Sequence, residues 1–221
     1  MNVLQPLERV RLKHRLREQS VAMPDLLRTE RLDALLLDLY GAELMPSHLQ
    51  VLVSQWAKYY FMQLIPAVLS ASLVHNRHYP LQLEYIALEL DERGIPVGIR
   101  FAGDGEVSQQ HQHDPFQRFA GLLDDNLQPF INTLSRYGGL ASRVLWSSAG
   151  DTLESCLTEA DGGCALLTER KRPDGRINPL FQTVTYRQLA DGEAPRRQRK
   201  ACCLSYRVEW VGRCEHCPLP D

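Results

Sequence analysis

Four of the six cysteines lie between residues 202 and 217, and this cluster restricts the fold more than any other sequence feature. Its members are Cys202, Cys203, Cys214 and Cys217, spaced as C-C-x10-C-x2-C. The first nineteen residues are charged from residue 8 onward and lack both an apolar run and a small-residue cleavage site. We therefore expect no signal peptide and a cytoplasmic location, where thiols stay reduced or bind metal. The clustered cysteines thus predict a metal-binding segment.

The spacing of these cysteines leaves two kinds of metal site open. Thiolates are soft ligands, and the candidates are zinc and an iron–sulfur cluster. A four-cysteine zinc site usually pairs two C-x2-4-C segments; residues 214–217 fit that pattern. Cys202 and Cys203 do not, because adjacent side chains of an extended chain point to opposite sides. A binuclear cluster has two irons to bind and accepts adjacent cysteines more easily, but spacing alone does not decide between the two.

The chain before the cysteines predicts mostly helices. Met23-Pro24-Asp25 and Ser47, as an N-cap, mark helix starts, whereas Pro66 should kink a helix or begin a new segment. Asp114-Pro115 opens a later helix that Gly138-Gly139 ends. The expected helices cover residues 4–19, 23–39, 47 to beyond 59, 115–137 and 140–160. Trp56, Tyr59, Tyr60 and Phe61 should belong to the core.

Two short strands and a turn lie in the middle of this helical pattern. Residues 83–90 and 95–101 predict a hairpin around the turn 91–94, and residues 181–189 predict a further strand. The sequence therefore predicts an α+β protein. Its mainly helical body, residues 1–189, contains a central β-hairpin or small antiparallel sheet, and residues 190–221 form a C-terminal metal lobe.

Charge and motifs exclude several function classes. The formal net charge of −2 and the lack of a basic face argue against nucleic-acid binding. The most apolar stretch, residues 59–74, is too short to span a bilayer, so we expect no stable membrane insertion. The sequence contains no glycine-rich dinucleotide fingerprint, P-loop or flavin motif. Electrons from a pyridine nucleotide would have to arrive through an external donor protein.

Three segments besides the cysteines resemble the FhuF-type family of siderophore-iron reductases. They are residues 143–148 (RVLWSS), residues 178–181 (NPLF) and residues 199–206, a basic run that leads into the double cysteine and ends on a tyrosine. The resemblance covers about the last eighty residues clearly. One departure is Ser205, where the family leads us to expect an arginine before the tyrosine.

The resemblance implies a function. It implies a [2Fe–2S] cluster held by Cys202, Cys203, Cys214 and Cys217, hence a C-terminal iron–sulfur lobe. The protein would be an oxidoreductase that transfers one electron to a ferric siderophore, of hydroxamate type, and releases Fe(II) in the cytoplasm. The alternative is a non-catalytic accessory protein of siderophore metabolism with a four-cysteine zinc site.

Residues near the cysteine cluster, and the two other cysteines, have several possible roles. The basic residues of 196–200 would raise the potential of a cluster or dock an acidic donor, or they form a solvated loop. His216 could replace a cysteine as ligand. Trp210 could line a chelate site or shield the cluster from water. We interpret Cys156 and Cys164 as ordinary thiols without metal.

Overall fold

The structure is a computed structural model that describes residues 19–108, 114–157, 165–188 and 194–219. Cys164 and nearly all of the helix expected over residues 4–19 lie outside these ranges. The fold is α+β, as predicted: half of it is helical, with small antiparallel sheets and a cysteine-rich C-terminal region. Among the described residues, no helix is both long and apolar enough to cross a bilayer.

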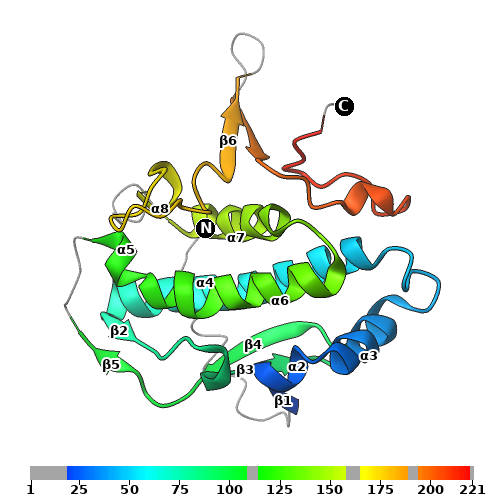
Figure 1. Cartoon of the computed structure of the whole chain (residues 1–221), viewed down its shortest axis with the longest axis horizontal. Coiled ribbons are helices and arrows are strands. Elements are labelled where there is room, and N and C mark those ends of the chain that lie inside the picture. The colour runs from blue at the N-terminus through cyan, green and yellow to red at the C-terminus, as the bar shows by residue number, and fades with distance from the viewer. Residues whose placement is uncertain (1–18, 109–113, 158–164, 189–193, 220–221) are drawn as a thin grey trace.

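Helix α4 (Leu49–His75) forms the centre of the molecule. It is apolar on most of its surface, which is typical of a helix that is covered on several sides. Figure 1 shows α4 and α6 (Gln128–Gly138) in a middle layer, between α7 (Ser142–Cys156) and the sheet. The cysteine-rich region lies beyond α7, on the side away from the sheet.

The main sheet has three antiparallel strands in the order β1-β3-β4. They are β1 (Gln19–Ala22), β3 (Ile86–Leu90) and β4 (Pro96–Phe101). The predicted hairpin is confirmed in β3 and β4. Its turn is closed by the Asp91 carboxylate, which accepts hydrogen bonds from the backbone N–H groups of Arg93 and Ile95, and Gly94 adopts a φ of 83°. Residues 83–85, expected as strand, form a 3₁₀ turn, η1 (Leu83–Tyr85).

Shorter elements complete the fold. Two-residue strands β2 (Arg77–His78) and β5 (Glu106–Val107) pair with each other. Strand β6 (Val184–Arg187) confirms the strand expected over residues 181–189 but starts later, because residues 181–183 form a turn. It pairs with β7 (Arg196–Arg199), which the sequence did not predict. The remaining helices are α2 (Met23–Leu26), α3 (Thr29–Tyr40), α5 (Pro115–Arg118), α8 (Ala165–Thr168), the π-helical η2 (Gly121–Leu127) and the 3₁₀ turn η4 (Ser205–Arg207).

Two predicted features of the N-terminal helices are wrong. The helix expected over 23–39 is two helices, because Arg28 is extended (φ −67°, ψ 140°) and separates α2 from α3. The break lets Met23 and Leu26 of α2, as well as Leu32 and Leu36 of α3, reach the core. Ser47 is not an N-cap, because α4 begins after His48. The Ser47 hydroxyl instead donates a hydrogen bond to the Leu44 carbonyl and contacts the His48 ring.

Pro66 does not begin a new segment, because α4 continues through it to His75. A proline inside a helix removes one backbone hydrogen bond. Burial of the neighbouring Leu64, Ile65, Val68 and Leu69 against surrounding elements offsets that loss. Long helices are thus stabilised mainly by packing, not by local propensity.

The long helical stretch after residue 114 follows the prediction at both ends. The Asp114 carboxylate accepts hydrogen bonds from the backbone N–H groups of Phe116 (3.0 Å) and Gln117 (3.2 Å), so it is the expected N-cap. The stretch runs through α5, η2 and α6 and ends at Gly139, which has a φ of 60°.

Aromatic side chains of α4 and α6 make up the middle of the core. The rings of Tyr60 and Phe130 stack with centroids 4.0 Å apart, and Trp56 and Phe61 also contact Phe130. Burial raises the pKa of Tyr60, whose hydroxyl donates to the side-chain oxygen of Asn126 at 2.8 Å. Of the four aromatic residues predicted in the core, only Tyr59 is half-buried; the others are fully buried.

The Asn-Pro-Leu segment at residues 178–180 closes the loop ahead of β6. Asn178 is 2% exposed, and its side-chain amide donates to the carbonyls of Leu166 (2.9 Å) and Glu169 (2.8 Å). Its side-chain oxygen accepts from the backbone N–H of Leu180 at 3.0 Å. One side chain therefore satisfies three backbone groups, and its bonds to Leu166 and Leu180 are buried.

Replacing Asn178 by alanine should lower the free energy of unfolding by about 2–4 kcal/mol, because the Leu166 carbonyl and the Leu180 N–H would stay buried without their partner. Urea denaturation followed by circular dichroism measures the change. Ile177→Ala is the matched control, since the adjacent Ile177 side chain is 65% exposed and should cost little. Equal losses in the two variants would contradict this role of Asn178.

Candidate metal centre

The predicted metal ligands lie in a lobe, residues 200–219, that contacts the helical body through polar side chains. We call this segment the cysteine lobe. The side-chain amide of Gln55 on α4 donates to the Cys203 carbonyl at 3.1 Å, and the Ser147 hydroxyl on α7 accepts from the Ala201 N–H at 3.1 Å. Arg207 donates to the Gln50 side chain at 2.8 Å. The lobe is therefore attached to α4 and α7; Figure 1 shows it on the α7 side of the molecule.

The structure brings the four predicted cysteines together as two pairs. The sulfurs of Cys203 and Cys214 are 3.6 Å apart, and the side chain of Cys202 makes a hydrogen-bond contact with that of Cys217. Cys203 and Cys217 are buried, whereas Cys202 and Cys214 are half-buried. Within the described ranges, no three His, Cys, Asp or Glu side chains meet where a single ion could bind. Two pairs of sulfurs suit a centre with two metals better than one tetrahedral ion.

A bend in the backbone directly follows the two adjacent cysteines. Leu204 has a φ of 67°, in the left-handed region that non-glycine residues rarely adopt. Its N–H donates to the Cys202 sulfur at 3.3 Å. On the other side, the Cys217 N–H donates to the Cys214 carbonyl at 3.1 Å and closes a turn. Such strained residues are concentrated at functional sites.

Comparison with known proteins identifies the family. Residues 54–194 match the model described as "Ferric iron reductase FhuF-like transporter", and residues 199–219 match the "FhuF 2Fe-2S C-terminal domain". The chain belongs to the FhuF-like ferric iron reductase family.

A curated relative of this FhuF-like chain is the "Ferric siderophore reductase" of Escherichia coli (strain K12). The two are 29% identical over 178 residues, which cover 76% of this chain and 65% of the relative. The chain thus spans slightly less than two thirds of that protein. The resemblance inferred from the sequence is confirmed, and so is the [2Fe–2S] cofactor, which leaves the zinc alternative without support.

One buried cation of this FhuF-like chain lies directly against a cysteine sulfur. Arg199, on β7, is 3% exposed, and its guanidinium donates to the Cys214 sulfur at 2.6 Å and to the Ser148 hydroxyl at 3.2 Å. Burial alone would lower the pKa of Arg199, but the sulfurs of Cys203 and Cys214 and the Asp151 carboxylate raise it. A fixed positive charge therefore lies against the Cys203–Cys214 pair.

Two other members of the predicted basic run have different partners. Arg197 forms ion pairs with Asp151 and Glu154 of α7. Lys200 donates to the Phe181 carbonyl and lies over the Phe181 ring, 5.5 Å from its centroid. Residues 196–199 are thus strand β7 and only Lys200 lies beyond it, so the prediction of a solvated loop is wrong for Arg197 and Arg199.

The Cys203 side of the centre holds further polar groups. The Ser205 hydroxyl lies 3.5 Å from the Cys203 sulfur and donates to the Gly212 carbonyl at 2.9 Å. In the thiol form, the hydrogen bond with Cys214 lowers the pKa of Cys203, and the charges of Lys58 and Arg199 lower it further. Ser205 stands where the family resemblance led us to expect an arginine, and in this chain it is a buried part of the site.

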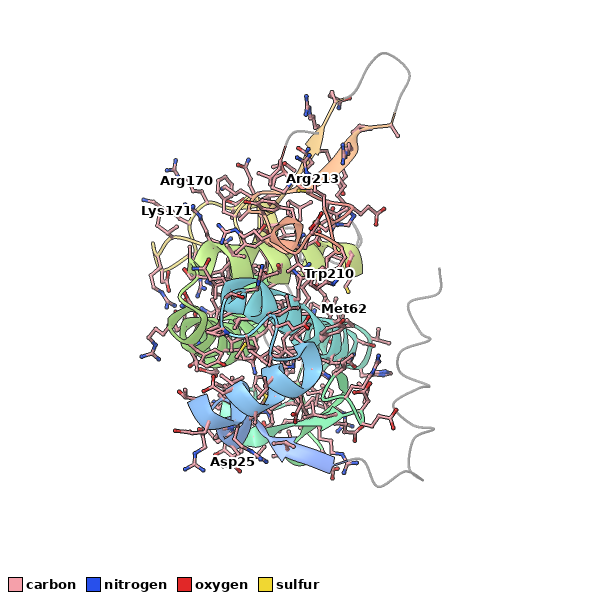
Figure 2. All side chains as sticks on the ribbon, turned by 90° about the vertical axis from the view of Figure 1, so that its right-hand side faces the viewer. Asp25, Met62, Arg170, Lys171, Trp210 and Arg213 are labelled. Atoms are coloured by element: carbon pink, nitrogen blue, oxygen red, sulfur yellow. The ribbon has the colours of Figure 1, made fainter. Side chains whose placement is uncertain are left out.

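The remaining predicted site residues are placed apart from the sulfurs or on the surface. The His216 ring lies 3.1 Å from an Asp151 carboxylate oxygen and also contacts Arg197, so its described contacts are with this network and not with cysteine. Trp210 is 74% exposed (Figure 2). Cys156 ends α7 and packs against the core.

The sequence reasoning missed the residues that surround the sulfurs from other elements. Gln55 and Lys58 come from α4, and Ser147, Ser148 and Asp151 come from α7. Only the two serines carried a signal, because they end the RVLWSS segment on which the family resemblance rests.

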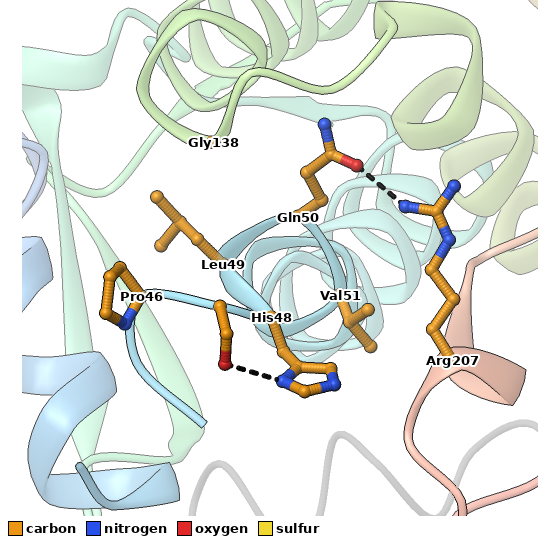
Figure 3. Close-up of a pocket in the computed structure, with 8 residues that line it drawn as sticks. Pro46, His48, Leu49, Gln50, Val51, Gly138 and Arg207 are labelled. Atoms are coloured by element: carbon orange, nitrogen blue, oxygen red, sulfur yellow. Dashed lines mark hydrogen bonds between the residues drawn. The ribbon is translucent and has the colours of Figure 1, made fainter. Parts of the chain in front are cut away.

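A pocket of about 320 Å³ lies between the start of α4 and the cysteine lobe (Figure 3). Arg207 lines its lobe side, and Gln50 and His48 line the helix side. The guanidinium of Arg207 and the imidazole of His48 are hydrogen-bond donors that suit an anionic oxygen ligand.

Proposed function

We propose that this chain is a ferric-siderophore reductase of the cytoplasm, in which Cys202, Cys203, Cys214 and Cys217 hold the [2Fe–2S] cluster. The observation that carries the proposal is the pairing of the four sulfurs, Cys203 with Cys214 and Cys202 with Cys217, within residues that match a 2Fe–2S domain. A buried arginine lies against one of these pairs. The substrate is a ferric chelate of hydroxamate type, and the product is Fe(II) released from the siderophore.

A single electron is enough to open such a chelate. Siderophores hold Fe(III) with hard anionic oxygens, and reduction removes one of the metal's three positive charges. Attraction to every ligand oxygen falls together, because Coulomb energy is proportional to the charge of the metal. When bound, the cluster supplies one electron without a proton or a covalent intermediate.

The residues of this chain make that electron available at the surface. Arg199 favours the reduced, more negative state, since its guanidinium donates to the Cys214 sulfur. Cys202 and Cys214 are only half-buried, so a bulky chelate can approach the centre without entering the core. Arg207 and His48 offer it donors in the pocket at the start of α4. The sequence has no nucleotide-binding motif, so an external protein supplies the electron.

An anaerobic titration tests the proposal. Protein reduced by one electron is mixed with ferric hydroxamates in the presence of a ferrous-specific chelator, and visible absorption follows the cluster. We expect the cluster to be reoxidised with one trapped Fe(II) per electron. Ferric catecholates should react more slowly, because their ligands carry more negative charge and hold Fe(III) more tightly.

The matched control is the same titration with the gallium(III) chelate, which has the same ligand and charge but does not accept an electron. Reoxidation by gallium chelates would show an electron leak to solvent. A cluster that stays reduced with every ferric chelate would refute the reductase and leave the 2Fe–2S protein without this activity.

A further inference from the structure

The pairing of the four sulfurs carries an inference about the two irons. We infer that Cys203 and Cys214 bind one iron, that Cys202 and Cys217 bind the other, and that the first iron accepts the electron. This inference rests on the ligand set proposed above.

The pairing follows from distance. Two thiolates about 2.3 Å from one tetrahedral metal lie about 3.8 Å apart. The sulfurs of Cys203 and Cys214 are 3.6 Å apart, so they need little movement to share an iron. Sulfurs on different irons lie further apart, because both metals and the bridging sulfides separate them.

The backbone supports the same pairing. A C-x2-C segment usually places both of its sulfurs on one metal. Here the 214–217 turn instead directs Cys214 to Cys203 and Cys217 to Cys202. The left-handed Leu204 follows the double cysteine directly, and Cys202 and Cys203 belong to different pairs.

The surroundings of the two pairs differ in charge. The Cys203–Cys214 pair receives a hydrogen bond from the buried guanidinium of Arg199 and has the Ser205 hydroxyl within 3.5 Å. For the Cys202–Cys217 pair, the described contact from outside the cysteines is the backbone N–H of Leu204, at 3.3 Å from Cys202. Charge-assisted hydrogen bonds are roughly twice as strong as neutral ones.

Reduction adds one negative charge, and this charge is most stable on the iron whose ligands receive the charged donor. One electron from the external donor converts that ferric iron to ferrous, and no bond forms or breaks. The iron returns to the ferric state when the electron passes to the chelate. The Cys202–Cys217 iron stays ferric throughout.

Proton NMR of the unmodified, reduced protein tests both parts of the inference. In a reduced binuclear cluster, cysteine β-protons on the ferric iron show large shifts that fall on heating. Those on the ferrous iron show small shifts that rise. Nuclear Overhauser contacts with Ser205 and Leu204 assign Cys203 and Cys202. We expect Cys203 and Cys214 to show the ferrous pattern.

Serine variants give an independent measurement on the oxidised protein. Iron-57 Mössbauer spectra distinguish an iron with oxygen ligands from one with four sulfurs. Cys203→Ser/Cys214→Ser should change one of the two iron signals, whereas Cys203→Ser/Cys217→Ser should change both. If either variant fails to hold a cluster, the NMR result on the native protein still decides.

The outcomes separate this inference from the proposed function. A ferrous pattern shared by Cys214 and Cys217 would overturn the pairing, and one on Cys202 and Cys217 would overturn the choice of iron. Neither result would affect reduction of chelates. A failed chelate titration, in contrast, would refute the reductase and leave the pairing intact.

Discussion

Replacement of Cys203 by alanine should yield a nearly colourless protein that has lost almost all cluster iron and sulfide and all reduction of ferric chelates. The Cys203 sulfur is fully buried and lies 3.6 Å from that of Cys214, and alanine offers no donor atom in its place. One iron would then lack a protein ligand in a site closed to substitutes. Visible absorption, with iron and sulfide analysis, measures the loss.

Cys156→Ala is the matched control for this prediction. Cys156 is also a free cysteine, but it ends α7 and packs against the core. Its replacement should keep the full cluster at a small cost in stability. A full cluster in Cys203→Ala, or a lost one in Cys156→Ala, would contradict the proposed ligands.

Replacement of Arg199 by methionine should lower the midpoint potential of the cluster by about 65–130 mV. A hydrogen bond to a charged group is worth about 1.5–3 kcal/mol, and about 1.4 kcal/mol corresponds to 59 mV for one electron. The guanidinium is 3% exposed, so solvent screens it little. Asp151 would keep its contacts with Arg197 and His216 in the variant. A redox titration followed by visible absorption measures the potential.

Lys200→Gln provides the control, because it removes the same charge one residue away. Lys200 is exposed, and its ammonium group lies over Phe181, so the potential should change far less. Arg199→Lys keeps the charge and should recover part of the lost potential. Equal shifts in Arg199→Met and Lys200→Gln would mean that net charge, and not the bond to Cys214, sets the potential.

Features encoded over a few residues could be predicted from the sequence. Asp114 caps its helix and Gly94 closes the hairpin turn because each acts on backbone groups two or three residues away. The cysteine spacing named the four residues whose sulfurs form the two pairs. In each case the chemistry lies within one short segment.

Features that depend on distant partners could not be predicted. Strand β1 forms because Val21 pairs with Leu88, and β7 forms because Arg199 pairs with Val184. The basic run looked solvated because its counter-charges, Asp151 and Glu154, lie on α7, more than forty residues earlier. The burial of Arg199 is likewise a tertiary property, although it is the most informative charge in the site.

The way in which the cysteine lobe joins the body has a practical consequence. The lobe has few buried apolar side chains of its own, and Gln55 of α4 and Ser147 of α7 hold its backbone beside the sulfurs. Melting of α4 or α7 would release the sulfur loops at the same time. Loss of the red-brown colour on warming would therefore report the melting of α4 or α7, although neither helix contains a proposed cluster ligand.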